Sequence, residues 1–233
     1  MLLLVAISIG AFVGAHFAPF PFLLDTTDDT AWSMPRTEIP TVYLTFDDGP
    51  NPTATPQLLD VLAKHKVRAT FFVIDKHITR DTVSIVRRTF DEGHGVAIHW
   101  HSRDLMFKGP TYVASTIQEA AARMELVTGH QACRAFRPHA GHRSIPMIMG
   151  AAQAGFVVVG FSWNAWDVSL FRKRSAGNIV PRLSKGASNG DIIVIHDGHH
   201  EDPRADRRYA VETVERLIPE LRKRGFEFGT ICP

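Results

Sequence analysis

Residues 41–52 read TVYLTFDDGPNP, a short apolar run that ends in two adjacent carboxylates, Asp47 and Asp48, followed by Gly49 and Pro50. The aromatic and β-branched residues of the run are typical of a buried strand. Glycine and proline directly after the acids indicate a turn. A plain Asp-Gly-Pro turn explains the second acid but not both. We therefore expect the pair to serve a chemical function at the end of a strand.

The composition is that of an ordinary globular protein. The chain has 233 residues, of which 45% are hydrophobic, enough to bury a full core in one domain. Lys and Arg number 26 against 24 for Asp and Glu, a net charge of +2. Such a balance gives no argument for a nucleic-acid partner, and we expect none.

The two cysteines, Cys133 and Cys232, are too few for a disulfide scaffold or a cysteine zinc site. We expect two reduced, buried thiols. A single bridge between them is the alternative in an oxidising compartment.

The N-terminal stretch, residues 1–24, reads MLLLVAISIGAFVGAHFAPFPFLL, and no Lys or Arg precedes Arg36. We expect a signal peptide or a membrane anchor, with an apolar extension packed on the domain as the alternative. Val13, Gly14 and Ala15 would suit a cleavage site, although the basic start of a signal peptide is missing. A signal peptide and a membrane anchor would both make the protein extracytoplasmic, either secreted or anchored in the membrane. We expect residues 25–39 to be a linker.

From residue 37 onward, β-rich runs alternate with helical stretches. This alternation predicts an α/β fold with about seven parallel strands, and closure into a barrel suits the chain length. The strands are expected at 42–46, 69–74, 95–98, 134–137, 156–161, 191–195 and 226–231. The clearest helices are expected at 57–65, 82–90, 112–127 and 208–224.

Polar side chains follow five of the predicted strands. In α/β barrels the chemistry gathers in the loops after the carboxyl ends of the strands. Taken singly, each group has an ordinary explanation, but together they would crowd acids, imidazoles and a guanidinium into one cleft. They are Asp47 and Asp48, His99 and His101, Arg137 and His139, Asn164 and Asp167, and His196 and Asp197.

Four motifs, LTFDDGP, FRPHAG, WNAWDV and DIIVIHDG, occur in this order along the chain. In sequence and spacing they resemble the motifs of polysaccharide deacetylases, the NodB homology domain of carbohydrate esterase family 4. The resemblance covers residues 40–231 and implies a catalytic domain over 40–233. It also implies a distorted (β/α) barrel, a divalent metal, and hydrolysis of N- or O-acetyl groups on carbohydrate.

The resemblance gives the paired acids different roles. Asp47 matches the general base, and Asp48 matches a metal ligand. Arg137 matches the arginine that pairs with the base and keeps it ionised, and the backbone N–H of Ala140 falls where the family places an oxyanion donor. Zinc is the first choice of metal, with cobalt, nickel or manganese also suited to Asp and His ligands.

The later motifs supply the acid. His196 matches the general acid that protonates the leaving amine, and Asp167 matches the carboxylate that orients this histidine. A helix cap or loop role is the alternative for Asp167. Trp163 and Val194 would suit a pocket for the acetyl methyl group, although both could equally be plain core.

The third predicted strand departs from the family, which requires two metal-binding histidines four positions apart. Four residues after His99 stands Arg103, which cannot be a ligand. His101 can take the role if the chain stays extended, because residues two apart then share a face. Otherwise the site has lost a ligand. His139 is a second possible donor, and so are His142, His199 and His200, but for each of these four we expect an exposed or hydrogen-bonded histidine instead.

The sequence therefore predicts a metal-dependent hydrolase that removes acetyl groups from a polysaccharide such as peptidoglycan or a chitin-like glycan. Two alternatives stay open. One is a non-catalytic carbohydrate-binding relative with a degenerate metal site. The other is an amidohydrolase of a small non-carbohydrate substrate. Retention of base, acid and their partners favours the enzyme.

Overall fold

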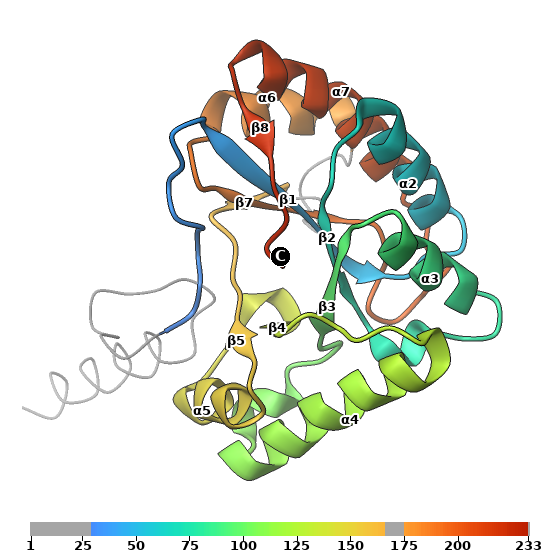
Figure 1. Cartoon of the computed structure of the whole chain (residues 1–233), viewed down its shortest axis with the longest axis vertical. Coiled ribbons are helices and arrows are strands. Elements are labelled where there is room, and N and C mark those ends of the chain that lie inside the picture. The colour runs from blue at the N-terminus through green and yellow to red at the C-terminus, as the bar shows by residue number, and fades with distance from the viewer. Residues whose placement is uncertain (1–28, 166–174, 233) are drawn as a thin grey trace, which may run out of the picture.

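A computed structural model describes residues 29–165 and 175–232 (Figure 1). The N-terminal stretch 1–24 and Asp167 lie outside the described residues. Among the helices of the described part, none combines the length and the apolar character that a membrane span requires.

Parallel strands form one sheet that curls into a half-barrel, with helices on its outer side (Figure 1). Seven of the described strands follow one another in the order β5-β4-β3-β2-β1-β7-β6, and β8 pairs with the start of β1. This confirms the predicted fold class. The strands are β1 Thr41–Gly49, β2 Thr70–Val73, β3 Gly95–His99, β4 Ala135–Arg137, β5 Val157–Val158, β6 Trp163–Asn164, β7 Ile192–His196 and β8 Glu227–Phe228.

Strand β1 lies at the centre of the sheet, between β2 and β7. Its side chains alternate between the two faces, as those of a strand must. Leu44 and Phe46 pack in the larger core, beneath the helices, whereas Tyr43 belongs to a second cluster on the inner face. The same alternation turns Asp47 toward the inside of the half-barrel.

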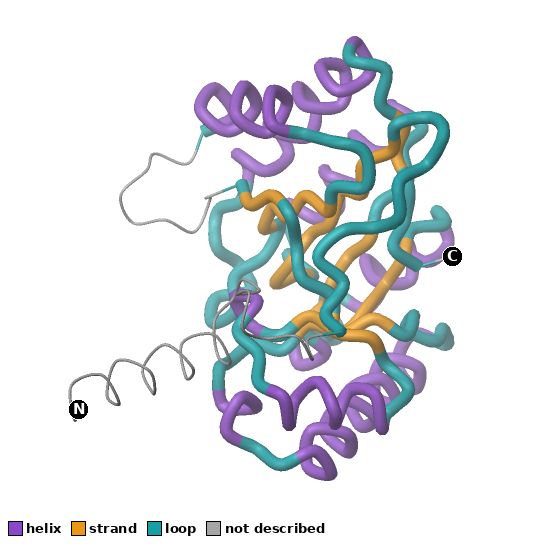
Figure 2. Tube along the Cα trace, turned by 90° about the vertical axis from the view of Figure 1, so that its left-hand side faces the viewer, coloured by secondary structure: helices purple, strands orange, loops and turns teal. Residues whose placement is uncertain are grey.

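Six α-helices cover the outside of the sheet in the described residues (Figure 2). The four predicted helices are present, and the first begins earlier than expected because Asn51 Oδ1 accepts the N–H groups of Thr53 and Ala54. The two helices that the prediction omitted carry internal Gly or Pro. The helices are α2 Ala54–His65, α3 Val83–Asp91, α4 Pro110–Thr128, α5 Ile145–Gln153, α6 Ala176–Gly186 and α7 Arg208–Lys223.

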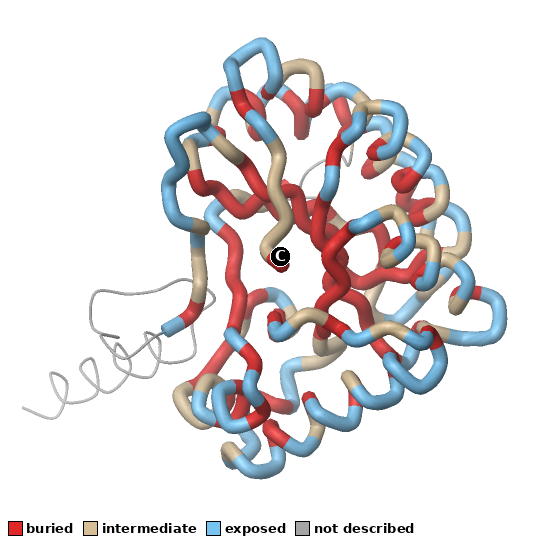
Figure 3. The backbone as a smooth tube through the Cα atoms, in the orientation of Figure 1, coloured by how far each residue is buried: buried red, intermediate tan, exposed pale blue. Residues whose placement is uncertain are grey.

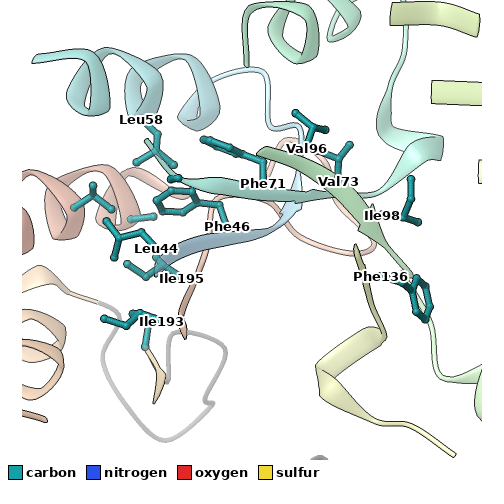
Figure 4. Packing of buried hydrophobic residues seen from close by; sticks show 14 of the residues in the cluster. Leu44, Phe46, Leu58, Phe71, Val73, Val96, Ile98, Phe136, Ile193 and Ile195 are labelled. Carbon is teal, nitrogen blue, oxygen red and sulfur yellow. The ribbon is translucent and has the colours of Figure 1, made fainter. Parts of the chain in front are cut away.

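The larger core fills the space between the sheet and the helices. Phe46 and Phe71 meet there with ring centroids 4.9 Å apart, and Leu58 of α2 packs onto the same cluster (Figure 4). In Figure 3 strands β1 to β4 and β7 are almost continuously buried, while the helices show buried and exposed stretches in turn. A sheet covered on both faces gives the strand ends a rigid base.

The segment expected to be a linker pairs with the sheet at its open side. The Ala31 N–H donates to Val158 O at 2.9 Å, and the Gly160 N–H donates to Ala31 O at 2.9 Å. Met34 N–H donates to Gly190 O at 2.8 Å. Residues 31–34 therefore join the end of β5 to the segment that enters β7.

Cys133 and Cys232 form a disulfide, with their Cα atoms 5.8 Å apart. The expectation of two reduced thiols is therefore wrong, and the alternative holds. The cause is the end of the chain, which enters the inner face of the sheet. There Cys232 lies in the cluster of Phe72 and Ala97, and the Ile231 N–H donates to Thr70 Oγ1.

The bridge should stabilise the domain strongly, because it closes a loop between cysteines 99 positions apart. For the double variant Cys133→Ser/Cys232→Ser we expect the free energy of unfolding to fall by roughly 3–5 kcal/mol. Urea denaturation measures this. Dithiothreitol should lower the stability of the parent protein and leave that of the variant unchanged; an equal response of both proteins would contradict the bridge.

Candidate active site

A β-bulge at Asp48 brings both acids of the opening motif to one site. Successive strand residues point to opposite faces, so two regular neighbours could not share a cleft. The pairing with β2 shifts between Asp47 and Gly49, and Asp48 has a φ of 71°. Asp tolerates this left-handed backbone better than most residues. The bulge thus re-aims the second carboxylate toward the side of the first.

The loop after β7 packs directly against this bulge. The Gly198 N–H donates to Asp47 O at 3.2 Å. A Cβ atom on Gly198 would lie only 2.0 Å from Asp48 O, so a glycine is required at this point. The two segments that carry the acids and His196 are therefore in contact through their backbones.

The first acid is held by a fully buried arginine. Arg137 Nη1 donates to Asp47 Oδ1 at 2.6 Å, and Nη2 donates to Gly160 O at 2.8 Å. Its Nε donates to Val159 O at 3.3 Å, and the guanidinium carbon lies 3.8 Å from the centroid of the Phe72 ring. With its N–H groups engaged on three sides, Arg137 fixes the orientation of the Asp47 carboxylate.

The second acid lies close to a ring nitrogen of a histidine. His99 Nε2 lies 3.2 Å from Asp48 Oδ1, but this oxygen accepts no hydrogen bond. The proton of the neutral ring is on Nδ1, which donates to Arg137 O at 2.8 Å, because a carbonyl can only accept. Lone pairs of Nε2 and Oδ1 therefore face each other, which a shared cation would stabilise.

His139 completes a cluster suited to such a cation. Ligand atoms of Asp48, His99 and His139 all lie within 4.8 Å of one another. Burial lowers the pKa of His139 to about 3, helped by the nearby His99 and His200, so its ring is neutral at ordinary pH. Burial alone would raise the pKa of Asp48, but the surrounding imidazoles, chiefly His99, outweigh it and lower this pKa below its usual range.

The structure does not group His101 with these three residues. Strand β3 ends at His99, and the chain bends at positions 102 and 103 before a 3₁₀ turn. The strand, and with it the alternation that favoured His101, therefore ends two residues before His101. Its ring lies against Trp100 instead, with centroids 4.9 Å apart.

The acids and histidines line one cavity of about 250 Å³. Neither Trp163 nor Val194 lies among the described residues that line it. Val194 is buried in the inner cluster, and Trp163 packs against the place where Gly186 lacks a side chain. The described lining residues are Asp47, Asp48, His99, Arg103, His139, Ala140, Phe161, Asn164, His196 and His200.

The remaining predicted residues are placed by the ends of β7 and β4. His196 pairs in register with Asp47 across the neighbouring strands, so the two lie side by side at the cavity. Ala140 has a φ of 54°, and its N–H donates to no other group of the described residues. Asp167, expected beside His196, lies outside the described residues.

A third acid, Asp197, is buried beneath the bulge. Thr55 Oγ1 donates to Asp197 Oδ2 at 2.5 Å. Burial raises the pKa of Asp197 to about 7, and the charges of Asp48 and Asp47 act in the same direction, against the Thr55 hydroxyl. Near neutral pH the Asp197 carboxyl group is therefore protonated in some molecules and charged in the others.

Comparison with known sequences agrees with this arrangement. The family model described as polysaccharide deacetylase matches residues 35–159. A peptidoglycan-N-acetylglucosamine deacetylase of Bacillus cereus is 30% identical over 215 residues, which cover 89% of this chain and 93% of the relative. A chitooligosaccharide deacetylase of Sinorhizobium fredii is 37% identical over 202 residues, covering 83% and 92%.

Solved structures show the same fold. A crystal structure of a peptidoglycan N-acetylglucosamine deacetylase has a TM-score of 0.76 and 27% identity, covering 91% of this chain and 95% of that one. A family 4 acetyl xylan esterase from Clostridium thermocellum, in complex with a cobalt ion, has a TM-score of 0.71 and 28% identity, covering 82% and 88%. The chain therefore belongs to the polysaccharide deacetylase family.

Proposed function

We propose that this protein hydrolyses the N-acetyl group of an N-acetylated glycan, using a divalent cation held by Asp48, His99 and His139. The observation that carries the proposal is the convergence of these three donors on one cavity that also exposes Asp47 and His196. A module that only bound carbohydrate would have no need for this set.

The donor atoms fit a catalytic cation. Asp48 Oδ1 and His99 Nε2 lie 3.2 Å apart, and His139 Nδ1 is buried without a hydrogen-bond partner. Three protein ligands of this kind suit zinc and leave it an open position. Cobalt, nickel and manganese accept the same donors. Once bound, such an ion polarises the acetyl carbonyl and lowers the pKa of water.

The chain's own residues would carry the proton transfers. Asp47, fixed by Arg137, takes the proton of the attacking water, and the oxygen of the acetyl group gains negative charge. The N–H of Ala140 is a donor for that oxyanion. His196 then gives a proton to the sugar nitrogen as the C–N bond breaks. Asp167 is proposed to orient His196.

The substrate class follows from the chemistry and the relatives. The two curated relatives described above act, by name, on peptidoglycan N-acetylglucosamine and on chitooligosaccharides. Both substrates carry acetamido sugars, so we propose an N-acetylhexosamine polymer. A small non-carbohydrate amide remains the substrate to exclude, by assaying acetate release from both kinds of compound.

We also propose that the protein acts outside the cytoplasm. The disulfide between Cys133 and Cys232 is of the kind that persists in oxidising compartments. Residues 1–24 would then direct export or anchor the chain in a membrane, and residues 40–233 would form the catalytic domain.

The two acids of the opening motif should respond differently to the same change. Asp47→Asn should lower kcat for acetate release by roughly 10²–10⁴ because the base is lost, with bound metal unchanged. Asp48→Asn should lower both the activity and the metal content, because a charged ligand is lost. Acetate assays and elemental analysis measure the two effects. Equal residual activity and equal metal content in both variants would reject these roles.

The third ligand is tested by a pair of histidine variants. His139→Ala should weaken zinc binding by about 100-fold or more, since removing even a residue behind a ligand costs 10–100-fold. His101→Ala is the matched control, and its zinc affinity should stay that of the parent. Competition with a chromophoric chelator measures both. Loss of zinc from the His101 variant alone would assign the third position to His101.

A further inference from the structure

Arg103 contributes a permanent positive charge to the wall of the cavity. It is exposed, and it is the one Lys or Arg among the described residues that line this cavity. It stands four positions after His99, the last residue of β3, in the bend that leads into a 3₁₀ turn.

No described acid neutralises this arginine. The neighbouring Asp104 carboxylate is occupied by Trp100 Nε1, at 2.9 Å, and by Ser102 Oγ. Asp47 is paired with Arg137, on the inner side of the half-barrel. Within residues 29–165 and 175–232, Arg103 forms neither an ion pair nor a side-chain hydrogen bond.

The position of Arg103 limits which groups of a bound sugar it can contact. An acetamido group at Asp47 and His196 would place the sugar ring in the cavity, with its other substituents toward the wall. A neutral substituent leaves the guanidinium in water. A carboxylate matches the planar N–H pairs of arginine and can accept two hydrogen bonds from them.

We propose that Arg103 binds a carboxylate carried by the sugar that is deacetylated or by its direct neighbour, so that the enzyme prefers acidic over neutral N-acetylated glycans. This inference rests on the proposed function for the location of the acetamido group. Arg103 acts here as a specificity-determining residue and takes no part in proton transfer.

The sharpest probe is a pair of ligands that differ only in charge. The disaccharide of N-acetylglucosamine and N-acetylmuramic acid carries one carboxylate, and its methyl ester carries none. Calorimetry with the zinc-loaded Asp47→Asn protein measures binding without turnover. The free acid should bind about tenfold more tightly than the ester, the gain expected for a hydrogen bond to a charged group that is partly screened. The difference should shrink as salt is added.

Three further variants in the same background assign this preference to Arg103. Arg103→Gln should bring the two dissociation constants together, and Arg103→Lys should retain part of the difference. Arg216→Gln is the matched control, because it removes one exposed charge from the outer helix α7, where Arg216 pairs with Glu212. This control should keep the tenfold ratio.

Equal affinity for acid and ester in the parent would overturn the proposal, and so would an unchanged ratio in Arg103→Gln. These outcomes are separate from the hydrolysis itself, which acetate release by the wild-type enzyme reports. If neither ligand releases acetate, the proposed function fails, while the binding ratio still decides the role of Arg103.

Discussion

The buried pair of Arg137 and Asp47 is the interaction on which the site depends. Strands β4 and β1 are separated in the sheet by β3 and β2, so the guanidinium reaches Asp47 only by crossing the inside of the curled sheet over Phe72. It also binds the carbonyl oxygens of Val159 and Gly160 beyond β5. Removing one partner of such a pair leaves an uncompensated buried charge, which costs several kcal/mol. The orientation of the Asp47 carboxylate therefore depends on the curvature of the sheet.

Three carboxyl groups lie close together at the end of β1, and each is accommodated differently. Asp47 is neutralised by Arg137, and Asp48 faces imidazole rings at a position suited to a cation. Asp197, which has neither, is accommodated by a raised pKa that follows from its burial. Three like charges in one interior would otherwise repel one another strongly.

Much of this arrangement could be predicted from the sequence, because strand ends in a parallel sheet converge. The run before Asp47 and the position of His99 follow from that rule, whereas the pairing of Arg137 with Asp47 was expected from the resemblance to the family. The position of His139 beside Asp48 and His99 did not follow, since no pattern tells where β3 stops and the chain bends. His139 was named as a weaker candidate; its place in a motif after β4 was the available signal. Trp163 and Val194 are not among the described residues that line the cavity, and their contact with the acetyl group stays a prediction.

Elements of two residues, such as β5 and β6, are too short to show a periodicity. The disulfide could not be predicted, because Cys232 reaches Cys133 only when the last residues of the chain enter the inner face of the sheet.

The bulge at Asp48 makes two identical neighbours chemically unequal. Asp47 continues the ladder with β7, whereas Asp48 departs from it, so the two cannot exchange tasks although their side chains are the same. An alignment that slides this motif by one position still matches an aspartate to an aspartate, and yet it exchanges the proton acceptor and the metal ligand that we propose. A deletion of one of the two aspartate codons would still leave one carboxylate to pair with Arg137. It would remove the bulge, however, and with it the proposed position of the cation.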